Sequence, residues 1–505
     1  MNIKNLTLSE KIGQMLCFAF HGTSYNEQLK LLIEELNIGN IIYFGRNIVD
    51  LKQTKDLNKT IRAKAKYPLF IGLDQEGGMV RRISKEITYL PGAMSLAAAG
   101  GNVYEITNRV ALDLKSLGFN INYAPVADIN NNPNNPVINS RSYGDEPKTV
   151  SKSVIKAYRA MQDAFLLPTI KHFPGHGDTS VDSHIGLPVV DKDLDALKKL
   201  ELIPFVDAIN SGVDGIMVSH ILYSKLDEIY PSSLSRNILT KLLKEELGFK
   251  GLITTDSLTM GAIWDKFSIE EIVEKGVDAG NDILVFCGPA TIKMQKEIVS
   301  TFHKLVSEGK ISMMRIDESV QKIISLKAKY NKSNNKSYPL DDLSEELVAK
   351  SITKVTDNSL LPIKKEDKVL IISPELKLET LTKPSGEYFT LGDFLEYEEI
   401  MINEKNNKRE LIDKIKHKYD KIIMATYNVS KGDYQQQIFK LLDKEKVINI
   451  ALRSPYDINV LASKTYICTY DYSPESLRAL SRKLFSNDFV GKLPIKLQGG
   501  KNESN

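Results

Sequence analysis

The chain of 505 residues carries 67 basic and 64 acidic residues, a formal net charge of +3, and 42% hydrophobic residues. These values lie near the averages of soluble globular proteins and argue against a disordered, fibrous or membrane-embedded chain. The length exceeds what one hydrophobic core usually organises, and the charges are spread without a basic patch, so we expect two domains and no nucleic-acid partner.

Short β-rich apolar runs alternate with longer helical patterns through the first two thirds of the chain, which is typical of parallel βα units. Eight strands with intervening helices predict an α/β fold, a (β/α)8 TIM barrel over residues 1–330. The eight runs begin at Gly13, Asn37, Pro68, Phe119, Leu167, Gly212, Gly248 and Gly280.

The polar stretch NKSNNKSYPLDD has the composition of a linker and predicts a domain boundary at 331–342. Beyond it, strand-like runs alternate with helical segments such as 475–485. They predict a smaller C-terminal α/β sandwich domain over residues 343–505. The strand-like runs begin at Lys368, Lys421, Lys446 and Thr465.

Polar and titratable residues gather where the predicted barrel strands end. The carboxyl ends of the strands carry the active site of a barrel, so this placement is what catalysis on that fold requires. For any one of these residues a solvent-exposed strand end is the simpler interpretation, whereas several together favour a site. The residues are Asp74, Asp128, Lys171, His172, His220 and Asp256.

The segment KHFPGHGDTSVDSH, residues 171–184, holds three of the seven histidines. His172 and His176 have the four-residue spacing of a zinc-binding helix, but the intervening proline and glycine would break such a helix, so we expect no metal. The glycines indicate instead a loop whose backbone approaches a ligand closely. On that loop Asp182 lies two residues before His184, close enough to hold one ring nitrogen and leave the other free to transfer a proton.

Asp256 closes the apolar run GLITTD and is followed by small polar residues. A carboxylate there can attack an anomeric carbon and form a covalent intermediate in glycoside hydrolysis, and a helix N-cap is the alternative. The cluster GLDQEGGMVRR places Asp74 at a strand end and Arg82 eight residues later. Such a pair can bind sugar hydroxyls through charge-assisted hydrogen bonds, although the cluster alone would be an acidic turn before a helix.

Four segments together resemble the family 3 glycoside hydrolases, in particular the bacterial β-N-acetylglucosaminidase (β-hexosaminidase) branch involved in cell-wall recycling. They are GLDQEGG with Arg82, NPVINSRSYGDEP with Arg141, KHFPGHGDT with DSH, and TTDSLTMGAI, in matching order over roughly residues 1–330. The C-terminal third is similar to the family's second domain more loosely, through AKSITKVTDNSLLPI, SPYDI and GKLPIKL.

The resemblance implies a role for individual residues. Asp256 would be the nucleophile, His184 the general acid/base and Asp182 the partner that orients it. A histidine acid/base is the mark of this branch, so the resemblance implies a retaining exo-β-N-acetylglucosaminidase that removes terminal β-linked N-acetylglucosamine from peptidoglycan fragments without metal or organic cofactor. The residues that would bind the non-reducing sugar are Asp74, Arg82, Arg141, Lys171 and His172.

Three residues near these motifs have no assigned role. Met79 stands where many relatives have a positively charged residue. The single tryptophan, Trp264, could stack on a sugar face, although core packing is the commoner fate. His220 ends a predicted strand and either faces the pocket or has a structural role.

Other functions stay open from the sequence. A phosphorylase would let phosphate replace water as the acceptor, because a histidine base repels an anion less than a carboxylate does. A barrel aldolase would use Lys171 to form a Schiff base with its substrate, but the sequence around Lys171 disfavours this function. A non-catalytic wall-glycan binding protein would have no need of Asp182, His184 and Asp256 together.

The start of the chain and its cysteines bear on the compartment. Polar residues from Asn5 to Lys11 interrupt the apolar stretch that a signal peptide needs, and no later segment reaches the length of a membrane span. We expect a cytoplasmic enzyme, or a secreted one if a leader has been removed, that acts on a small glycan or muropeptide, with a monomer compatible with the sequence. Three cysteines in apolar runs favour buried free thiols: Cys17, Cys287 and Cys468.

Overall fold

The computed structural model describes residues 3–180, 182–183, 186–332, 342–376 and 389–497. Its first sheet contains nine parallel strands in the order β5-β4-β3-β2-β1-β11-β10-β8-β6. Each predicted barrel run contributes to it. The strands are β1 (Leu16–Ala19), β2 (Asn40–Tyr43), β3 (Phe70–Leu73), β4 (Ile121–Asn122), β5 (Leu167–Pro168), β6 (Ile170–Phe173), β8 (Gly215–Val218), β10 (Leu252–Ser257) and β11 (Ile283–Phe286).

The sheet closes on itself through the predicted run that begins at Leu167. This run is split, because β5 pairs with β4 while β6 pairs with β8. The two ends of the strand order are therefore one segment of chain, and Lys171 in β6 also bridges to Val126 beyond β4. The fold is the predicted α/β barrel, with one of its eight strand runs broken in two.

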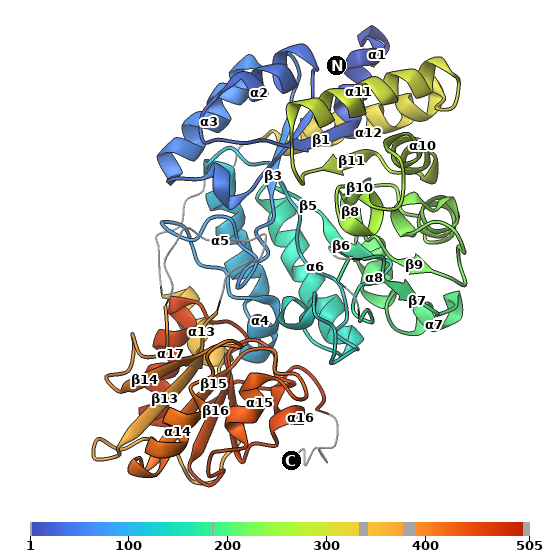
Figure 1. Ribbon diagram of the computed structural model, residues 1–505. Helices are drawn as coiled ribbons and strands as arrows, with labels where there is room; N and C mark the ends of the chain where they lie inside the picture. The colour runs from blue at the N-terminus through green and yellow to red at the C-terminus, as the bar shows by residue number, and fades with distance from the viewer. Residues whose placement is uncertain (1–2, 181, 184–185, 333–341, 377–388, 498–505) are drawn as a thin grey trace.

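Helices alternate with the strands along the chain and surround the barrel (Figure 1). Thr7 and Glu10 form a capping box that begins the first helix. The helices are α1 (Leu8–Met15), α2 (Glu27–Lys30), α3 (Leu51–Lys64), α4 (Ala93–Ala99), α5 (Val103–Ser116), α6 (Pro147–Asp163), α7 (Leu194–Lys199), α8 (Ile203–Asn210), α9 (Gly261–Trp264), α10 (Ile269–Ala279), α11 (Ile292–Ser307) and α12 (Met313–Tyr330), and a short sheet pairs β7 (Val189–Val190) with β9 (Leu222–Tyr223).

The second sheet has the strand order β12-β17-β16-β15-β13-β14. All neighbours are parallel except β12, which is antiparallel to β17. Its elements are α13 (Leu343–Ser351), β12 (Thr353–Thr356), β13 (Val369–Pro374), β14 (Glu398–Ile402), α14 (Arg409–Ile415), β15 (Lys421–Thr426), α15 (Tyr434–Phe439), β16 (Val447–Ala451), α16 (Asp457–Leu461), β17 (Thr465–Cys468) and α17 (Pro474–Ser486).

The order of this sheet reverses around β13, since the chain runs from β13 to β14 on one side and then to β15 on the other. In such sheets, ligands bind in the crevice outside the carboxyl ends of the strands, at the point where the strand order reverses. The α/β class predicted for the C-terminal third is confirmed. The predicted linker at 331–342 lies mostly outside the described residues, so the domain boundaries stay a prediction.

The second domain packs beside the barrel (Figure 1). An apolar cluster joins Met94 and Ala98 of α4 to Tyr456 and Tyr466 of the second domain. Polar contacts add to it, because the Asn139 side chain donates a hydrogen bond to Ser454 Oγ at 3.1 Å. These contacts hold the loop that follows β16 against the barrel.

The described helices include none with both the length and the apolar character that crossing a membrane requires. The three cysteines are free thiols, of which Cys17 and Cys468 are buried and Cys287 is partly exposed.

Candidate active site

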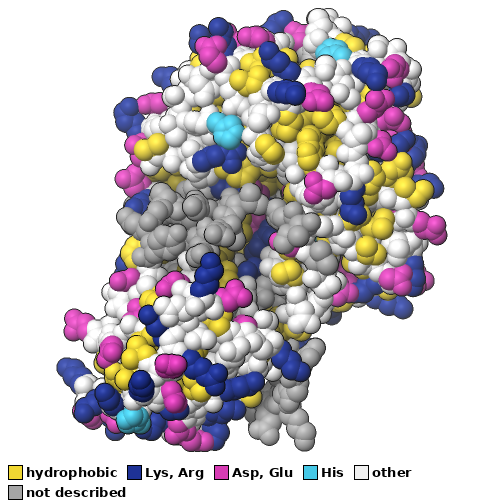
Figure 2. Space-filling view, viewed as in Figure 1, with side chains coloured by type: hydrophobic (Ala, Val, Ile, Leu, Met, Phe, Trp, Pro, Cys, Tyr) yellow, Lys and Arg dark blue, Asp and Glu magenta, His cyan; other side chains and the backbone are white. Residues whose placement is uncertain are grey.

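A cleft of about 610 Å³ lies where the barrel strands end and the second domain begins. Figure 2 shows the surface hollowed between the two parts of the molecule. His184 lies outside the described residues. Every other predicted site residue lines this cleft: Asp74, Arg82, Arg141, Lys171, His172, Asp182 and Asp256.

Paired charges form one side of the cleft. Asp74, directly after β3, accepts hydrogen bonds from Arg82 and Lys171, each at 2.8 Å. Glu76 accepts two hydrogen bonds from Arg141, both at 2.8 Å, and forms an ion pair with Lys171 at 2.6 Å. Lys171 therefore joins the two carboxylates into one network, in which each cation has an anionic partner.

The network fixes the charge of its members. Burial alone would raise the pKa of Glu76, but the charges of Arg141 and Lys171 hold it well below its usual range. The pKa of Asp74 is lowered in the same way, against its burial, by Lys171 and Arg82. Burial would lower the pKa of Lys171, and the two carboxylates raise it instead. All these groups are charged at neutral pH.

Asp256 is the second-last residue of β10, where the pairing of β10 with β11 is irregular between Thr254 and Ser257. An irregularity of this kind changes the direction in which side chains leave a strand. One carboxylate oxygen accepts a hydrogen bond from the Ser257 amide at 2.7 Å. Burial opposes ionisation, but the charges of His172, His220 and Lys171 lower the pKa of Asp256 to about 2. The carboxylate is ionised at neutral pH.

Asp128 holds the backbone of the histidine-rich loop and the ring of His172. It accepts hydrogen bonds from the amides of His172 and His176, at 3.1 and 2.7 Å, and it bonds His172 Nδ1 at 2.7 Å. A carboxylate on Nδ1 leaves Nε2 as the nitrogen that can bond a ligand. Gly177 is required by packing, since a Cβ there would lie 1.6 Å from the carbonyl oxygen of Ile129.

His176 connects this loop to the segment that carries Asp182. Its Nδ1 bonds Thr179 Oγ1 at 2.9 Å and its Nε2 bonds Ser183 Oγ at 3.3 Å. Burial, followed by the charge of His172, lowers the pKa of His176 to about 4, so the ring is neutral at neutral pH. The carbonyl of Ser183 accepts a hydrogen bond from the Ala262 amide at 3.2 Å. The Asp182 segment is thus tied to α9, the helix that follows Asp256.

Two residues without an assigned role have structural contacts. His220 bonds Ser233 Oγ through Nδ1 at 2.8 Å and the Ser257 carbonyl through Nε2 at 2.9 Å. It therefore supports the backbone beside Asp256. Trp264 packs against the core of the barrel and does not line the cleft.

Among the residues that line the cleft, several had no site role predicted from the sequence, including Glu76, Tyr427 and Arg453. Glu76 stands within the DQEGG segment, so its position was available as a signal. Arg453 directly precedes the SPYDI segment, and Tyr427 follows the run KIIMAT. Neither pattern indicates by itself that a residue of the second domain reaches a barrel site.

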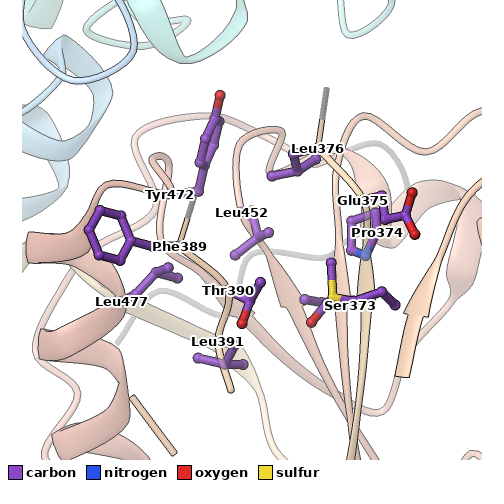
Figure 3. Close-up of a pocket in the computed structure, with 12 residues that line it drawn as sticks. Ser373, Pro374, Glu375, Leu376, Phe389, Thr390, Leu391, Leu452, Tyr472 and Leu477 are labelled. Atoms are coloured by element: carbon purple, nitrogen blue, oxygen red, sulfur yellow. The ribbon is translucent and has the colours of Figure 1, made fainter. Parts of the chain in front are cut away.

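A second cavity, of about 280 Å³, lies at the carboxyl ends of β13, β15 and β16. Leucine side chains make up much of its lining, and Glu375 is the carboxylate among the lining residues shown in Figure 3. The ring of Tyr472 stands beyond the strand ends in this view. This lining lacks the paired charges of the cleft, which is therefore the better candidate for chemistry on a polar substrate.

The parallel barrel carries an ionised carboxylate at a strand end, a second carboxylate in the same cleft, and charged groups able to bind hydroxyls. These are the features of a barrel glycoside hydrolase. Residues 7–326 match the family described as glycosyl hydrolase family 3 N terminal domain. The chain belongs to this family and is a glycoside hydrolase.

Curated relatives match large parts of this chain. Beta-hexosaminidase A of Pseudoalteromonas piscicida is 33% identical over 425 residues, which cover 73% of this chain and 71% of that protein. A β-hexosaminidase of Stenotrophomonas maltophilia (strain K279a) is 28% identical over 286 residues, 55% of this chain and 84% of that protein.

Solved structures extend the likeness over the whole described fold. A glycoside hydrolase family 3 β-N-acetylglucosaminidase from Paenibacillus sp. str. FPU-7 superposes with a TM-score of 0.91 at 34% identity, over 97% of this chain and 99% of that chain. A β-glucoside phosphorylase superposes with a TM-score of 0.82 at 23% identity, over 98% of this chain and 95% of that chain, and shares the fold.

Proposed function

We propose that this glycoside hydrolase is a retaining exo-β-N-acetylglucosaminidase that removes non-reducing terminal β-linked N-acetylglucosamine, with peptidoglycan fragments as natural substrates. The observation that carries the proposal is the ionised Asp256 carboxylate in a cleft that Asp182 also lines. The names of the Pseudoalteromonas and Paenibacillus relatives, a β-hexosaminidase and a β-N-acetylglucosaminidase, support the N-acetylhexosaminide specificity.

The paired charges suit a neutral sugar. Each cation of the network already has a carboxylate partner, so the network carries little unsatisfied charge while its remaining donors and acceptors can bond hydroxyl groups. Asp74, Arg82, Arg141, Lys171 and the Nε2 atom of His172 would hold the terminal sugar beside Asp256.

In the first step, Asp256 attacks the anomeric carbon as protonated His184, oriented by Asp182, gives its proton to the departing oxygen. The glycosidic C–O bond breaks and an ester bond to Asp256 forms. The low pKa of Asp256 keeps it anionic, as a nucleophile must be. The role of His184 rests on the DSH motif, since the residue lies outside the described part of the chain.

In the second step, neutral His184 takes a proton from water, and the water oxygen attacks the same carbon. The ester bond breaks, Asp256 leaves as a carboxylate, and the product keeps the configuration of the substrate. Two inversions at one carbon account for the retention.

The experiment that tests the activity is release of p-nitrophenol from its β-N-acetylglucosaminide and its β-glucoside, with and without phosphate. Preference for the N-acetyl substrate without need of phosphate supports the proposal. Strong stimulation by phosphate, with N-acetylglucosamine 1-phosphate as product, would identify a phosphorylase. No release from either substrate would contradict the proposed specificity.

A further inference from the structure

Two side chains of the second domain line the cleft and have no part in the mechanism above. Tyr427 follows β15 and Arg453 follows β16. We propose that they form the subsite for the leaving group, and that this subsite selects leaving groups with a carboxylate next to the glycosidic oxygen. The inference rests on the proposed function, because a leaving-group subsite presupposes glycoside cleavage in this cleft.

The position of Arg453 relative to the sugar-binding network supports this assignment. Its guanidinium donates a hydrogen bond to the carbonyl of Pro136 at 3.3 Å, and the next carbonyl, of Val137, accepts one from Arg141 at 3.3 Å. Arg453 thus lies just outside the network, on the side of the second domain. An exo-acting enzyme that holds the terminal sugar in the network would direct the remainder of the substrate toward this side.

Arg453 differs from Arg82, Arg141 and Lys171, each of which is paired with a carboxylate. No carboxylate of the described residues lies within 4.0 Å of its guanidinium. Its hydrogen bonds, to the Pro136 carbonyl and to the Tyr427 hydroxyl, are long at 3.3 and 3.4 Å, and its Nε is buried without a partner. A guanidinium with unused donors is suited to bind a carboxylate through two parallel hydrogen bonds.

Tyr427 supplies a fixed aromatic surface beside this cation. Gln435 accepts a hydrogen bond from the Tyr427 amide at 2.9 Å and donates one to its carbonyl at 3.0 Å, which fixes the backbone. The ring of Tyr472 packs against Tyr427 edge-on, with centroids 5.7 Å apart, and Arg453 lies 5.8 Å from the Tyr427 centroid. Aromatic rings in fixed positions bind ligand faces at small entropic cost.

These features identify the leaving group by its chemistry. A sugar ring would pack on Tyr427 while a carboxylate on that ring reaches Arg453. In the disaccharide N-acetylglucosaminyl-β-1,4-N-acetylmuramic acid, the lactyl ether places a carboxylate next to the glycosidic oxygen. Chitobiose has a hydroxyl at that position and is otherwise the same molecule, so the two disaccharides form a matched pair.

The test is the ratio of kcat/KM for the muramic acid disaccharide to kcat/KM for chitobiose. We expect R453Q to lower this ratio by about tenfold or more, because it removes a charge-assisted hydrogen bond. R453K, which keeps the charge, should retain part of the preference. R409Q, at an exposed position of the second domain, is the matched control and should leave the ratio unchanged. The unfolding transition, followed by Trp264 fluorescence, shows whether each variant is folded.

An unchanged ratio in R453Q, or equal loss on both disaccharides, overturns the subsite. Loss confined to the formation of N-acetylglucosamine 1-phosphate also overturns it, since the cation would then serve a phosphate acceptor. Calorimetric titration with free N-acetylmuramic acid and N-acetylglucosamine tests the leaving-group subsite separately from the proposed glycosidase activity, because it needs no turnover. Binding of the acid sugar that R453Q weakens supports the subsite even if the aryl glycosides are not cleaved, and equal binding of both sugars contradicts it.

Discussion

Replacement of Glu76 by glutamine tests whether the charge network is a unit. The substitution keeps the shape of the side chain and removes its charge. Arg141 then loses its carboxylate partner, while Lys171 keeps its contact with Asp74. The new amide group also places N–H donors against cations.

The magnitude follows from the contacts that are lost. Glu76 is 6% exposed and accepts three hydrogen bonds or ion pairs of 2.6 to 2.8 Å from two cations. Removal of one partner from a buried ion pair costs about 3–5 kcal/mol of unfolding free energy. We expect E76Q to lose about 3 kcal/mol at pH 7 and to raise KM for the aryl glycoside, since the sugar-binding cations lose their positions.

The loss should depend on pH in a defined direction. The pKa of Glu76 is lowered in the folded protein from its usual 4.5, so its contribution is complete above about pH 4.5 and declines as the pH falls toward the folded pKa. The difference between wild type and E76Q should shrink below that pH by about 1.4 kcal/mol per pH unit.

The assay is urea unfolding between pH 7 and pH 3.5, followed by fluorescence of Trp264, the single tryptophan, which is partly buried against the barrel core. The control is E105Q, which removes a half-exposed carboxylate paired with Arg109 and should cost less than about 1 kcal/mol. A loss in E76Q no larger than in E105Q, or one that does not change between pH 5 and 3.5, would refute the reasoning.

Three further predictions concern the catalytic segments. D256N should reduce kcat by roughly 10⁴-fold or more while N-acetylglucosamine still binds in a calorimetric titration; loss of binding as well would indicate a structural aspartate. H184A should impair substrates with poor leaving groups more than activated aryl glycosides, because the latter need little protonation, and equal loss in kcat/KM would count against an acid role. The pKa of His176 is about 4 in the folded protein, below its usual 6.5, so wild-type stability should fall as the pH drops from 6.5 to 4. H176N should lack this component of the pH dependence. The same change of the urea midpoint with pH in wild type and H176N would contradict the prediction.

Much of the barrel could be predicted because its strands are continuous apolar runs that end in polar residues. The split between β5 and β6 could not, since it depends on which neighbours the run from Leu167 meets when the sheet closes. In the second domain, β12 and β14 were not predicted. Both lie at sheet edges, and β14 begins with the two charged residues Glu398 and Glu399, which hide its strand pattern.

The candidate site could be predicted where one motif holds the residues and not where two distant segments meet. Asp74 and Asp256 lie at the ends of barrel strands and Lys171 lies in β6 of the same barrel, so their convergence follows from the fold. The pairing of Glu76 with Arg141 joins residues 65 positions apart. Arg453 reaches the cleft only because the second domain packs on α4, and no local pattern specifies that orientation.

The role of Asp256 as the nucleophile is the central claim, and trapping of the glycosyl-enzyme tests it most directly. A slow fluorinated N-acetylglucosaminyl substrate should label the protein, and mass spectrometry of its peptides should find the sugar on Asp256, with a β-configured product released by wild type. A label on another residue, or a first product of inverted configuration, would contradict the account.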